Sequence, residues 1–407
     1  MGYSSSAFKG VSWMGFLRIS TRLITFVRLA ILARILTPQQ FGVFGIATLF
    51  LAFLETVTET GINVFLIQRK EKISQYLDPA WAVSILRGIL IALLIVITAP
   101  LVIRFFNSPE SLSIILLIAL VPFIRGFINP SIITIQKEIQ FHKEFYLRFI
   151  LFLTDASVAI TVAFITRSAE SMAIGLIVSA LFEVLLSFLF FKPLPKLSFE
   201  FNKIKYVISR SFWVTITGIF SYTSENGDDI VVGRMLGTGS LGIYQVAYKI
   251  STLPITELTN TVSKVVFPVY SKFSEDKERL FRAFTKVTAS SSVIALFLGL
   301  IIFVFAEQIV VIILGNNWLT AIPIVRILAV YGVLRTIFGN FAPLFLSIER
   351  QDYVAKMTFV RVLGLVVTIV PFVAYFGLVG AAYSAIFSIL IEIPIILLYT
   401  HKIFRNT

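Results

Sequence analysis

The sequence predicts an all-α polytopic membrane protein, with about 12 transmembrane helices in two six-helix bundles around a central cavity. Hydrophobic residues make up 57% of its 407 residues and charged residues only 14%, whereas soluble proteins carry roughly 25% charged residues. Apolar stretches of about 20 residues, long enough to cross a ~30 Å hydrocarbon core, recur from Leu17 to Tyr399. An internal repeat, described below, indicates two similar halves.

Twelve apolar segments are long enough to be spans. They are residues 15–36, 41–66, 80–104, 112–135, 147–166, 171–191, 209–233, 240–268, 287–306, 321–346, 357–376 and 378–400. The residues before Leu17 lack the long apolar region and the small-residue cleavage site of a signal peptide. We therefore expect the first helix to remain in the mature protein.

The basic residues are distributed unevenly between the two sides of these spans. With the N-terminus inside, 21 Lys and Arg residues fall on the cytoplasmic side, and only Arg34, Arg104, Arg167 and Arg234 on the other. Cytoplasmic loops carry an excess of Lys and Arg, so we expect a multi-pass protein of a bacterial or archaeal cytoplasmic membrane with both termini in the cytoplasm. This topology explains the net charge of +13 without nucleic acid as a partner.

Two segments of the chain, residues 31–44 and 231–244, align without a gap at an offset of 200 residues. The identical pairs are Arg34/Arg234, Leu36/Leu236 and Gly42/Gly242. Six spans separate equivalent points, so the two halves have the same orientation and form a parallel repeat. We expect a six-helix bundle over 1–191, a basic cytoplasmic linker over 192–209 and a second six-helix bundle over 210–407, with a substrate cleft between the bundles.

Two motifs resemble a known family. Residues 226–247, NGDDIVVGRMLGTGSLGIYQVA, look like the seventh and eighth helices of the Wzx-type polysaccharide transporters, and residues 59–70, ETGINVFLIQRK, resemble the end of their second helix. This family belongs to the MOP superfamily, with the MATE drug exporters and the lipid II flippase. The likeness is closest to its colanic-acid and teichuronic-acid branch, whose members often carry fourteen spans where this sequence supports twelve.

The resemblance implies a MOP/MATE-like fold and a flippase function. The substrate would be an undecaprenyl-diphosphate-linked oligosaccharide, moved from the inner to the outer leaflet by alternating access for synthesis of a polysaccharide such as O-antigen. The expected partners are this substrate, membrane lipids, a proton or sodium ion that drives transport, and a polysaccharide polymerase complex. The sequence contains no Gly-rich phosphate-binding loop that would indicate an ATP-driven pump.

Charged residues inside the spans are the candidate site residues, because such groups usually face a protein interior or a wet cavity. Arg18, Arg22 and Arg28 form a basic stripe on the first helix, and polar residues including Lys249 and Asn260 recur at helical spacing on the eighth. We predict that these five residues bind the substrate. We predict that acidic and polar groups on the second and seventh helices supply the coupling charge and line the cavity: Glu55, Glu59, Asn63, Glu225, Asp228 and Asp229.

Each of these groups also has a structural explanation. Arg18 and Arg22 lie near the cytoplasmic end of their helix, where arginines often extend to lipid headgroups. Asp228 and Asp229 could form a permanent buried salt bridge, for instance to an arginine of the first helix, instead of binding an ion or a proton. Arg125, Asp155 and Glu183 could simply pair among themselves within the first half.

Two other functions remain open from the sequence. A cation-coupled, MATE-like multidrug exporter would need an acidic or aromatic cavity, whereas a diphosphate calls for arginine, which this chain supplies. A membrane polysaccharide polymerase or glycosyltransferase would need a long outer loop or an acidic pair in the first one, which these short connections lack. The chain has no cysteine and only two histidines, at membrane edges, so we expect no enzymatic activity, no catalytic residue, no cofactor and no metal site.

Overall fold

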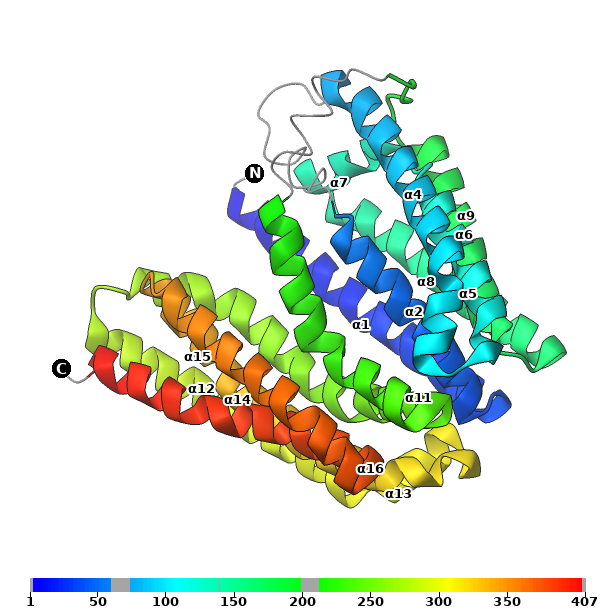
Figure 1. Ribbon diagram of the computed structural model, residues 1–407. Coiled ribbons are helices and arrows are strands. Elements are labelled where there is room, and N and C mark those ends of the chain that lie inside the picture. Colours follow the sequence, from blue (N-terminus) through cyan, green and yellow to red (C-terminus); the bar gives the residue numbers. More distant parts are fainter. Residues whose placement is uncertain (1–2, 60–73, 139, 199–211, 405–407) are drawn as a thin grey trace. The chain divides into compact units, whose positions relative to one another are not determined.

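The computed structural model describes residues 3–59, 74–138, 140–198 and 212–404. Within these ranges the regular structure is helical, and no β-strand occurs (Figure 1). Seven of the described helices are long and apolar enough to cross a membrane. The chain is therefore a polytopic, all-helical membrane protein, as predicted. It divides into two compact units, residues 1–223 and 224–407, which are described one at a time.

In chain order the described elements of the first unit are α1 (Tyr3–Ile35), α2 (Pro38–Val57), α4 (Ser74–Phe106), η1 (Pro109–Ser111), α5 (Leu112–Ile118), α6 (Leu120–Arg125), η2 (Pro130–Ile133), α7 (Thr134–Lys137), α8 (Phe141–Thr166), α9 (Glu170–Phe190) and the first residues of α11 (Phe212–Lys272). Of these, α1, α2, α4, α8 and α9 are long helices of 20 or more residues, and the other described segments of this unit are shorter. Helix α8 packs against both α1 and α9, and α4 packs against α5 and α6. The start of α11 is fixed to α2, since the Tyr222 hydroxyl donates to the Leu49 carbonyl at 2.8 Å.

The fourth predicted span, residues 112–135, is broken rather than continuous. Helix α6 ends at Arg125, and regular helical structure resumes only at η2. Asn129 fixes the break to α9: its backbone N–H donates to Ser187 Oγ at 3.0 Å, and its side-chain amide donates to the Phe191 carbonyl at 3.0 Å. Its own Oδ1 accepts from the Ser131 amide at 2.9 Å and so starts η2. These bonds satisfy backbone groups that the interrupted helix would otherwise leave unpaired.

The second unit continues α11 from Ser224 and adds the remaining elements. These are α12 (Lys277–Val304), α13 (Ala306–Ile309), the π-helical turn η3 (Val310–Leu314), η4 (Asn316–Ala321), α14 (Ile322–Gly339), α15 (Phe341–Ser347) and α16 (Gln351–Phe404). Helix α14 packs against both α12 and α16. A buried apolar cluster that includes Tyr270, Leu280, Phe345 and Tyr353 joins the ends of α11, α12, α15 and α16.

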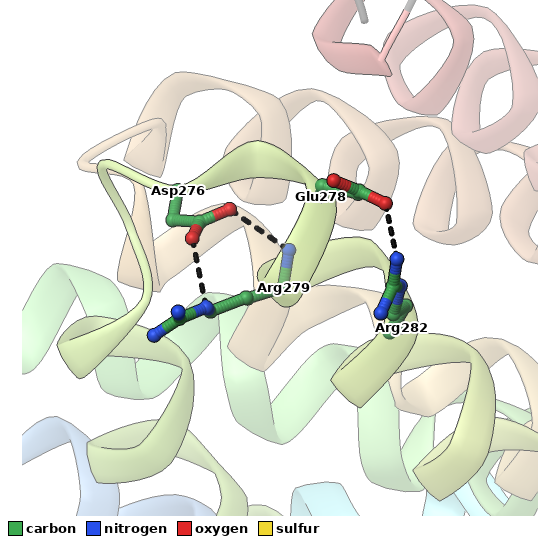
Figure 2. Close-up of polar contacts among 4 residues, drawn as sticks. All are labelled: Asp276, Glu278, Arg279 and Arg282. Atoms are coloured by element: carbon green, nitrogen blue, oxygen red, sulfur yellow. Dashed lines mark hydrogen bonds and ion pairs between the residues drawn. The ribbon is translucent and has the colours of Figure 1, made fainter.

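Helix α12 begins at a charged connector (Figure 2). The Asp276 carboxylate accepts from the Arg279 backbone amide at 3.0 Å and pairs with the Arg279 guanidinium at 3.1 Å. Glu278 pairs with Arg282 one turn further on. An aspartate at this position satisfies one of the unpaired N–H groups of the first helical turn, so the sequence defines the start of α12 locally.

Two long helices turn at glycines with positive φ. Helix α11 is interrupted at Gly237 (φ 81°) and α16 at Gly377 (φ 59°), so each comprises two spans joined by a tight turn. Gly237 aligns at the 200-residue offset with Thr37, which lies in the turn between α1 and α2 and caps α2. The connection therefore falls at the same repeat position in both units, which agrees with the predicted repeat.

The expected linker lies partly outside the described residues. Residues 192–198 are described, and they pack on the first unit through bonds from Ser131 Oγ to the Pro193 carbonyl and from the Lys196 amide to Asp78. The domain boundary at 192–209 and the cytoplasmic position of both termini stay predictions.

Candidate functional site

Helix α1 carries the predicted basic stripe, and its three arginines have different surroundings. Arg18 is half-buried and Arg22 is exposed. Arg28 is half-buried, and its Nη2 pairs with Asp155 Oδ1 of α8 at 3.1 Å. Of the three, Arg28 thus has a partner inside the first unit, which the sequence did not indicate.

A cavity of about 340 Å³ lies inside the first unit and is called the first-unit cavity below. The broken fourth span forms part of its wall, together with α2, α4, α8 and α9. Its charged lining comprises Glu55, Arg87, Arg125, Glu144, Arg148 and Glu183. Of these six residues, Glu55 was predicted as a site residue, and the other five were not assigned to a site from the sequence.

Glu183 of α9 is shared by two arginines of this cavity. It lies 3.4 Å from Arg125 Nε and 3.7 Å from Arg148 Nη1. Its side chain is 11% exposed, against 40% for Arg125 and 48% for Arg148. The expected pairing within the first half therefore occurs between Arg125 and Glu183, while Asp155 pairs with Arg28 of α1.

Arg87 of α4 holds the end of α2. Its Nη2 donates to the Glu55 carbonyl at 2.7 Å and its Nε to the Thr58 carbonyl at 2.9 Å. These carbonyls belong to the last helical turn, where backbone acceptors lack partners and a positive charge is favoured. Arg87 thus fixes α2 at the point where the predicted acids Glu55 and Glu59 lie.

The predicted acids of the seventh span lie together in the second unit. Asp228 is buried, and its Oδ2 accepts from the Tyr244 hydroxyl at 2.8 Å. Asp229 is half-buried and accepts from Gln245 Nε2 at 3.0 Å. Both donors belong to the part of α11 that follows the turn at Gly237. The two aspartates therefore bond across this turn, from the seventh span to the eighth.

Beside these aspartates, a small cavity of about 20 Å³ contains an arginine between two tyrosines. Arg335 Nη1 donates to the Tyr248 hydroxyl at 2.6 Å and to the Tyr331 hydroxyl at 3.4 Å. Glu225 and Asp228 line the same cavity. A volume of this size has room for about one water molecule or one ion and is too small for a lipid-linked sugar.

Four further predicted residues are not part of the described lining of these two cavities. Glu59 is exposed just beyond α2, and Lys249 is exposed on α11. Asn260 lies on α11, but its side chain is outside what the structure describes, and Asn63 lies outside the described residues altogether. Within the described ranges no group of three His, Cys, Asp or Glu residues could hold a metal ion.

The sequence pattern missed two sets of site residues. One set is the arginines of the first-unit cavity, Arg87, Arg125 and Arg148. The other is Tyr248, Tyr331 and Arg335 of the second unit. Their position inside apolar segments was the available signal for the arginines, because intramembrane charges are expensive. The tyrosines gave none, since a tyrosine at helical spacing is also an ordinary core or interface residue.

The fold and these clusters define a multi-pass helical membrane protein with ionised groups inside each of its two units. A family model described as "Polysaccharide biosynthesis protein" matches residues 31–323. This match spans more than half of the chain, and the chain belongs to that family.

Among curated proteins, the chain is 25% identical over 386 residues to an uncharacterized membrane protein in the cps region of Klebsiella pneumoniae, covering 94% of this chain and 79% of that protein. It is 24% identical over 354 residues to the lipopolysaccharide biosynthesis protein WzxC of Escherichia coli, covering 86% of this chain and 72% of WzxC.

Among solved structures, the lipid II flippase MurJ in an inward closed conformation matches with a TM-score of 0.75 at 16% identity, covering 95% of this chain and 87% of MurJ. An inward-facing MATE multidrug transporter of the MOP superfamily matches with a TM-score of 0.70 at 16% identity, covering 94% of each chain. At this identity these matches establish a shared fold.

Proposed function

We propose that this protein is a flippase for an undecaprenyl-diphosphate-linked oligosaccharide, which it moves from the inner to the outer leaflet during polysaccharide biosynthesis. The proposal rests on the match to the polysaccharide biosynthesis family, taken together with the arginines that lie among the membrane helices of this chain. A charged side chain at mid-bilayer costs at least ~2.5–3.5 kcal/mol, so such groups are usually functional. The name of WzxC and the fold shared with a lipid II flippase support the same function.

The diphosphate of the substrate is the group that arginines of α1 are suited to bind. Guanidinium groups form paired hydrogen bonds with phosphate oxygens and stay charged at any physiological pH. Arg22 is exposed and Arg18 is half-buried, and Arg28 is half-buried and paired with Asp155. Lys249 and Asn260 are proposed as further substrate contacts.

The acids are proposed to couple transport to a proton or sodium gradient. A gradient does work only if the affinity for the ion differs between the inward and outward states. Asp228 is the preferred coupling residue, because it is buried and bonds across the turn between the seventh and eighth spans. Asp229, Glu225, Glu55, Glu59 and Asn63 are proposed to line its path. A polymerase complex that receives the flipped unit is the proposed protein partner.

The fold shared with a MATE transporter makes a cation-coupled drug exporter the second candidate. An exported organic cation would be repelled by Arg18 and Arg22, whereas a diphosphate would be attracted to them. A polymerase or glycosyltransferase has less support, because the first outer connection is only the short turn between α1 and α2.

The test is a flipping assay with the purified protein in vesicles. A fluorescent undecaprenyl-diphosphate-linked sugar is placed in both leaflets, and an impermeant reductant is then added outside. Without transport, only the outer half of the fluorescence is lost. We expect nearly complete loss with this protein, and uptake of a cationic dye into energised vesicles at the protein-free rate. Loss of only half of the fluorescence, or faster dye uptake, would contradict the flippase function.

A further inference from the structure

The first-unit cavity is a second possible binding site, separate from the arginines of α1. Its volume of about 340 Å³ is at the lower end of the ~300–1,000 Å³ that small-molecule sites occupy. It therefore fits one headgroup or one sugar with its phosphate rather than a whole oligosaccharide. It lies within the first unit, so its shape does not depend on the second.

The wall of this cavity is built around irregular backbone. Between Arg125 and Pro130 the fourth span has no helix, although α4, α8 and α9 beside it are apolar helices long enough to cross a membrane. Irregular backbone at membrane depth is tolerated only where it is buried in protein or lines a water-filled space. The bonds of Asn129 to α9 hold the break in one conformation. The cavity is thus a fixed polar space.

The bounds of α8 and α9 show how far Arg148 and Glu183 lie from the ends of their helices. Arg148 lies seven residues after the start of α8, and Glu183 lies seven residues before the end of α9. Seven residues span about 10 Å. The two helices are consecutive, so the ion pair lies about two turns from the helix ends on the side predicted to be cytoplasmic.

Arg125 and Arg148 together carry more N–H donors than one carboxylate can accept. Arg125 and Arg148 share the single carboxylate of Glu183, so this cluster of three carries one excess positive charge. Arg125 Nε is buried and faces Glu183 at 3.4 Å, so the donors that can reach a ligand are those at the end of the guanidinium. Both arginine side chains nevertheless keep 40% or more of their surface exposed, so they can reach a ligand. A group with several anionic oxygens matches these donors.

The same cavity is also lined by carboxylates, which do not favour the binding of an anion that has no hydroxyl groups. Glu55 and Glu144 line it together with Arg87. Ionised carboxylates only accept hydrogen bonds, so they suit hydroxyl groups and repel phosphate. Arginines and glutamates facing one space therefore match a phosphate that carries neighbouring hydroxyls.

We propose that the first-unit cavity binds a polyol phosphate, with Arg125 and Arg148 on the phosphate and Glu144 on a hydroxyl. Two sources share this chemistry. One is a sugar phosphate, such as the first sugar of a lipid-linked substrate, and the other is the glycerol phosphate headgroup of phosphatidylglycerol.

The test measures binding by calorimetry with the purified full-length protein in detergent. The probes are inorganic phosphate, glucose 1-phosphate and a short-chain phosphatidylglycerol. We expect saturable binding of one of the two polyol phosphates, at least tenfold tighter than inorganic phosphate. Tighter glucose 1-phosphate binding assigns the sugar source, and tighter phosphatidylglycerol binding assigns the lipid source. Equal affinity for inorganic phosphate would overturn the role of the hydroxyls, and no saturable binding would overturn the site.

Three variants locate the binding. Arg148→Gln should weaken the polyol phosphate at least tenfold, while Glu183 keeps Arg125 as its partner. Glu144→Gln should weaken the polyol phosphate but leave inorganic phosphate unchanged. Arg167→Gln, an exposed arginine at the other end of α8, is the matched control and should bind as the unmodified protein does. Unchanged affinity in a folded Arg148→Gln protein would overturn the assignment.

The assignment to a sugar phosphate rests on the proposed flippase function, whereas the assignment to a lipid headgroup does not. The two can fail separately, because the binding assay involves no transport: a protein that binds a polyol phosphate here but does not flip the lipid-linked sugar would contradict the flippase function and leave this site intact.

Discussion

Arg22 and Arg28 lie six residues apart on α1 and differ in exposure. Arg28 is half-buried and pairs with Asp155 of α8 at 3.1 Å, so it helps to hold α1 on α8. Arg22 is exposed, and it is an arginine that we propose to contact the diphosphate of the substrate.

Neutralising Arg22 should abolish flipping without unfolding the protein. Arg22→Ala removes an exposed side chain, so stability should change by less than ~0.5 kcal/mol, whereas flipping should fall to the rate without protein. Arg22→Lys should restore only part of the rate, because a lysine cannot bind phosphate through two parallel bonds. Flipping in vesicles and thermal unfolding are measured together.

The control for Arg22 is Arg104→Ala, which removes an exposed arginine from the end of α4. It should flip at the normal rate. If Arg22→Ala also flips at the normal rate, the basic stripe is structural and the substrate binds elsewhere.

Replacing Asp228 should separate coupling from transport. Asp228→Asn keeps an acceptor for the Tyr244 hydroxyl but removes the charge. We expect loss of gradient-driven accumulation while passive equilibration of the substrate continues. Substrate distribution is measured in vesicles with and without an imposed pH or sodium gradient.

Tyr244→Phe is the companion variant, since it removes the bond to Asp228 and keeps the carboxylate. It should lower stability by about 1–3 kcal/mol, because a buried acceptor loses its partner. Gradient-driven transport that persists unchanged in Asp228→Asn would exclude Asp228 from the coupling mechanism.

Two glycines allow helices α4 and α6 to pack closely against each other. Gly88 of α4 faces α6, and a Cβ at this position would lie 2.5 Å from the Pro122 carbonyl oxygen. Gly126 approaches α4 in the same way, with its Cβ position 3.0 Å from the Ser84 carbonyl oxygen. The contact is between backbones, so neither side chain rotation nor repacking relieves it.

Gly88→Ala should therefore destabilise the protein by about 1–3 kcal/mol. Gly15→Ala is the matched control, because no atom lies within 4 Å of its Cβ position on α1. That variant should be neutral or more stable by up to about 1 kcal/mol, since alanine favours helix over glycine. Thermal unfolding of both variants in detergent checks the difference. Equal unfolding temperatures would show that α4 and α6 can move apart.

An Arg–Glu pair joins the last two spans of each unit. In the first unit Arg148 of α8 pairs with Glu183 of α9, and in the second Arg361 pairs with Glu392 across the turn at Gly377. Glu392 is only 2% exposed, and its Oε1 has no hydrogen-bond partner. Arg361 lies 213 residues after Arg148 and Glu392 lies 209 residues after Glu183, so the two pairs do not coincide at the 200-residue offset, and each is a local contact between neighbouring helices.

The long helices could be predicted from the sequence because apolar length alone determines a span. The turn after α1 was also readable, since Thr37 and Pro38 are residues that end one helix and start another. The pairing of Arg28 with Asp155 could not be predicted, because the two residues are 127 positions apart in the sequence and the pattern within one helix does not show which distant residue it will contact. The break near Asn129 was missed for a different reason: Gly126, Asn129 and Pro130 are helix-breaking residues, but glycine and proline also occur inside several other predicted spans, where they are tolerated.

At the scale of the whole molecule, the parallel repeat and the charge asymmetry predict which turns face outside. The chain has no cysteine, so an introduced cysteine is a unique label site. Asn317→Cys, exposed on η4, should react with an impermeant maleimide in intact cells. Ser271→Cys and Lys402→Cys, also exposed, should react only after the membrane is permeabilised.

The outcome tests both parts of the prediction. Labelling of Lys402→Cys in intact cells would place the C-terminus outside. If Asn317→Cys reacts only after permeabilisation and Ser271→Cys reacts in intact cells, the membrane topology is the reverse of the predicted one.

The bonds of Asn129 to α9 also have a consequence for how the chain is made. Ser187 is synthesised 58 residues after Asn129, which takes a ribosome about 3–12 s. During that interval the broken fourth span lacks the acceptors that later satisfy it, so it cannot rest alone in lipid. We therefore expect the fourth and sixth spans to enter the bilayer together, once Ser187 and Phe191 are available to Asn129.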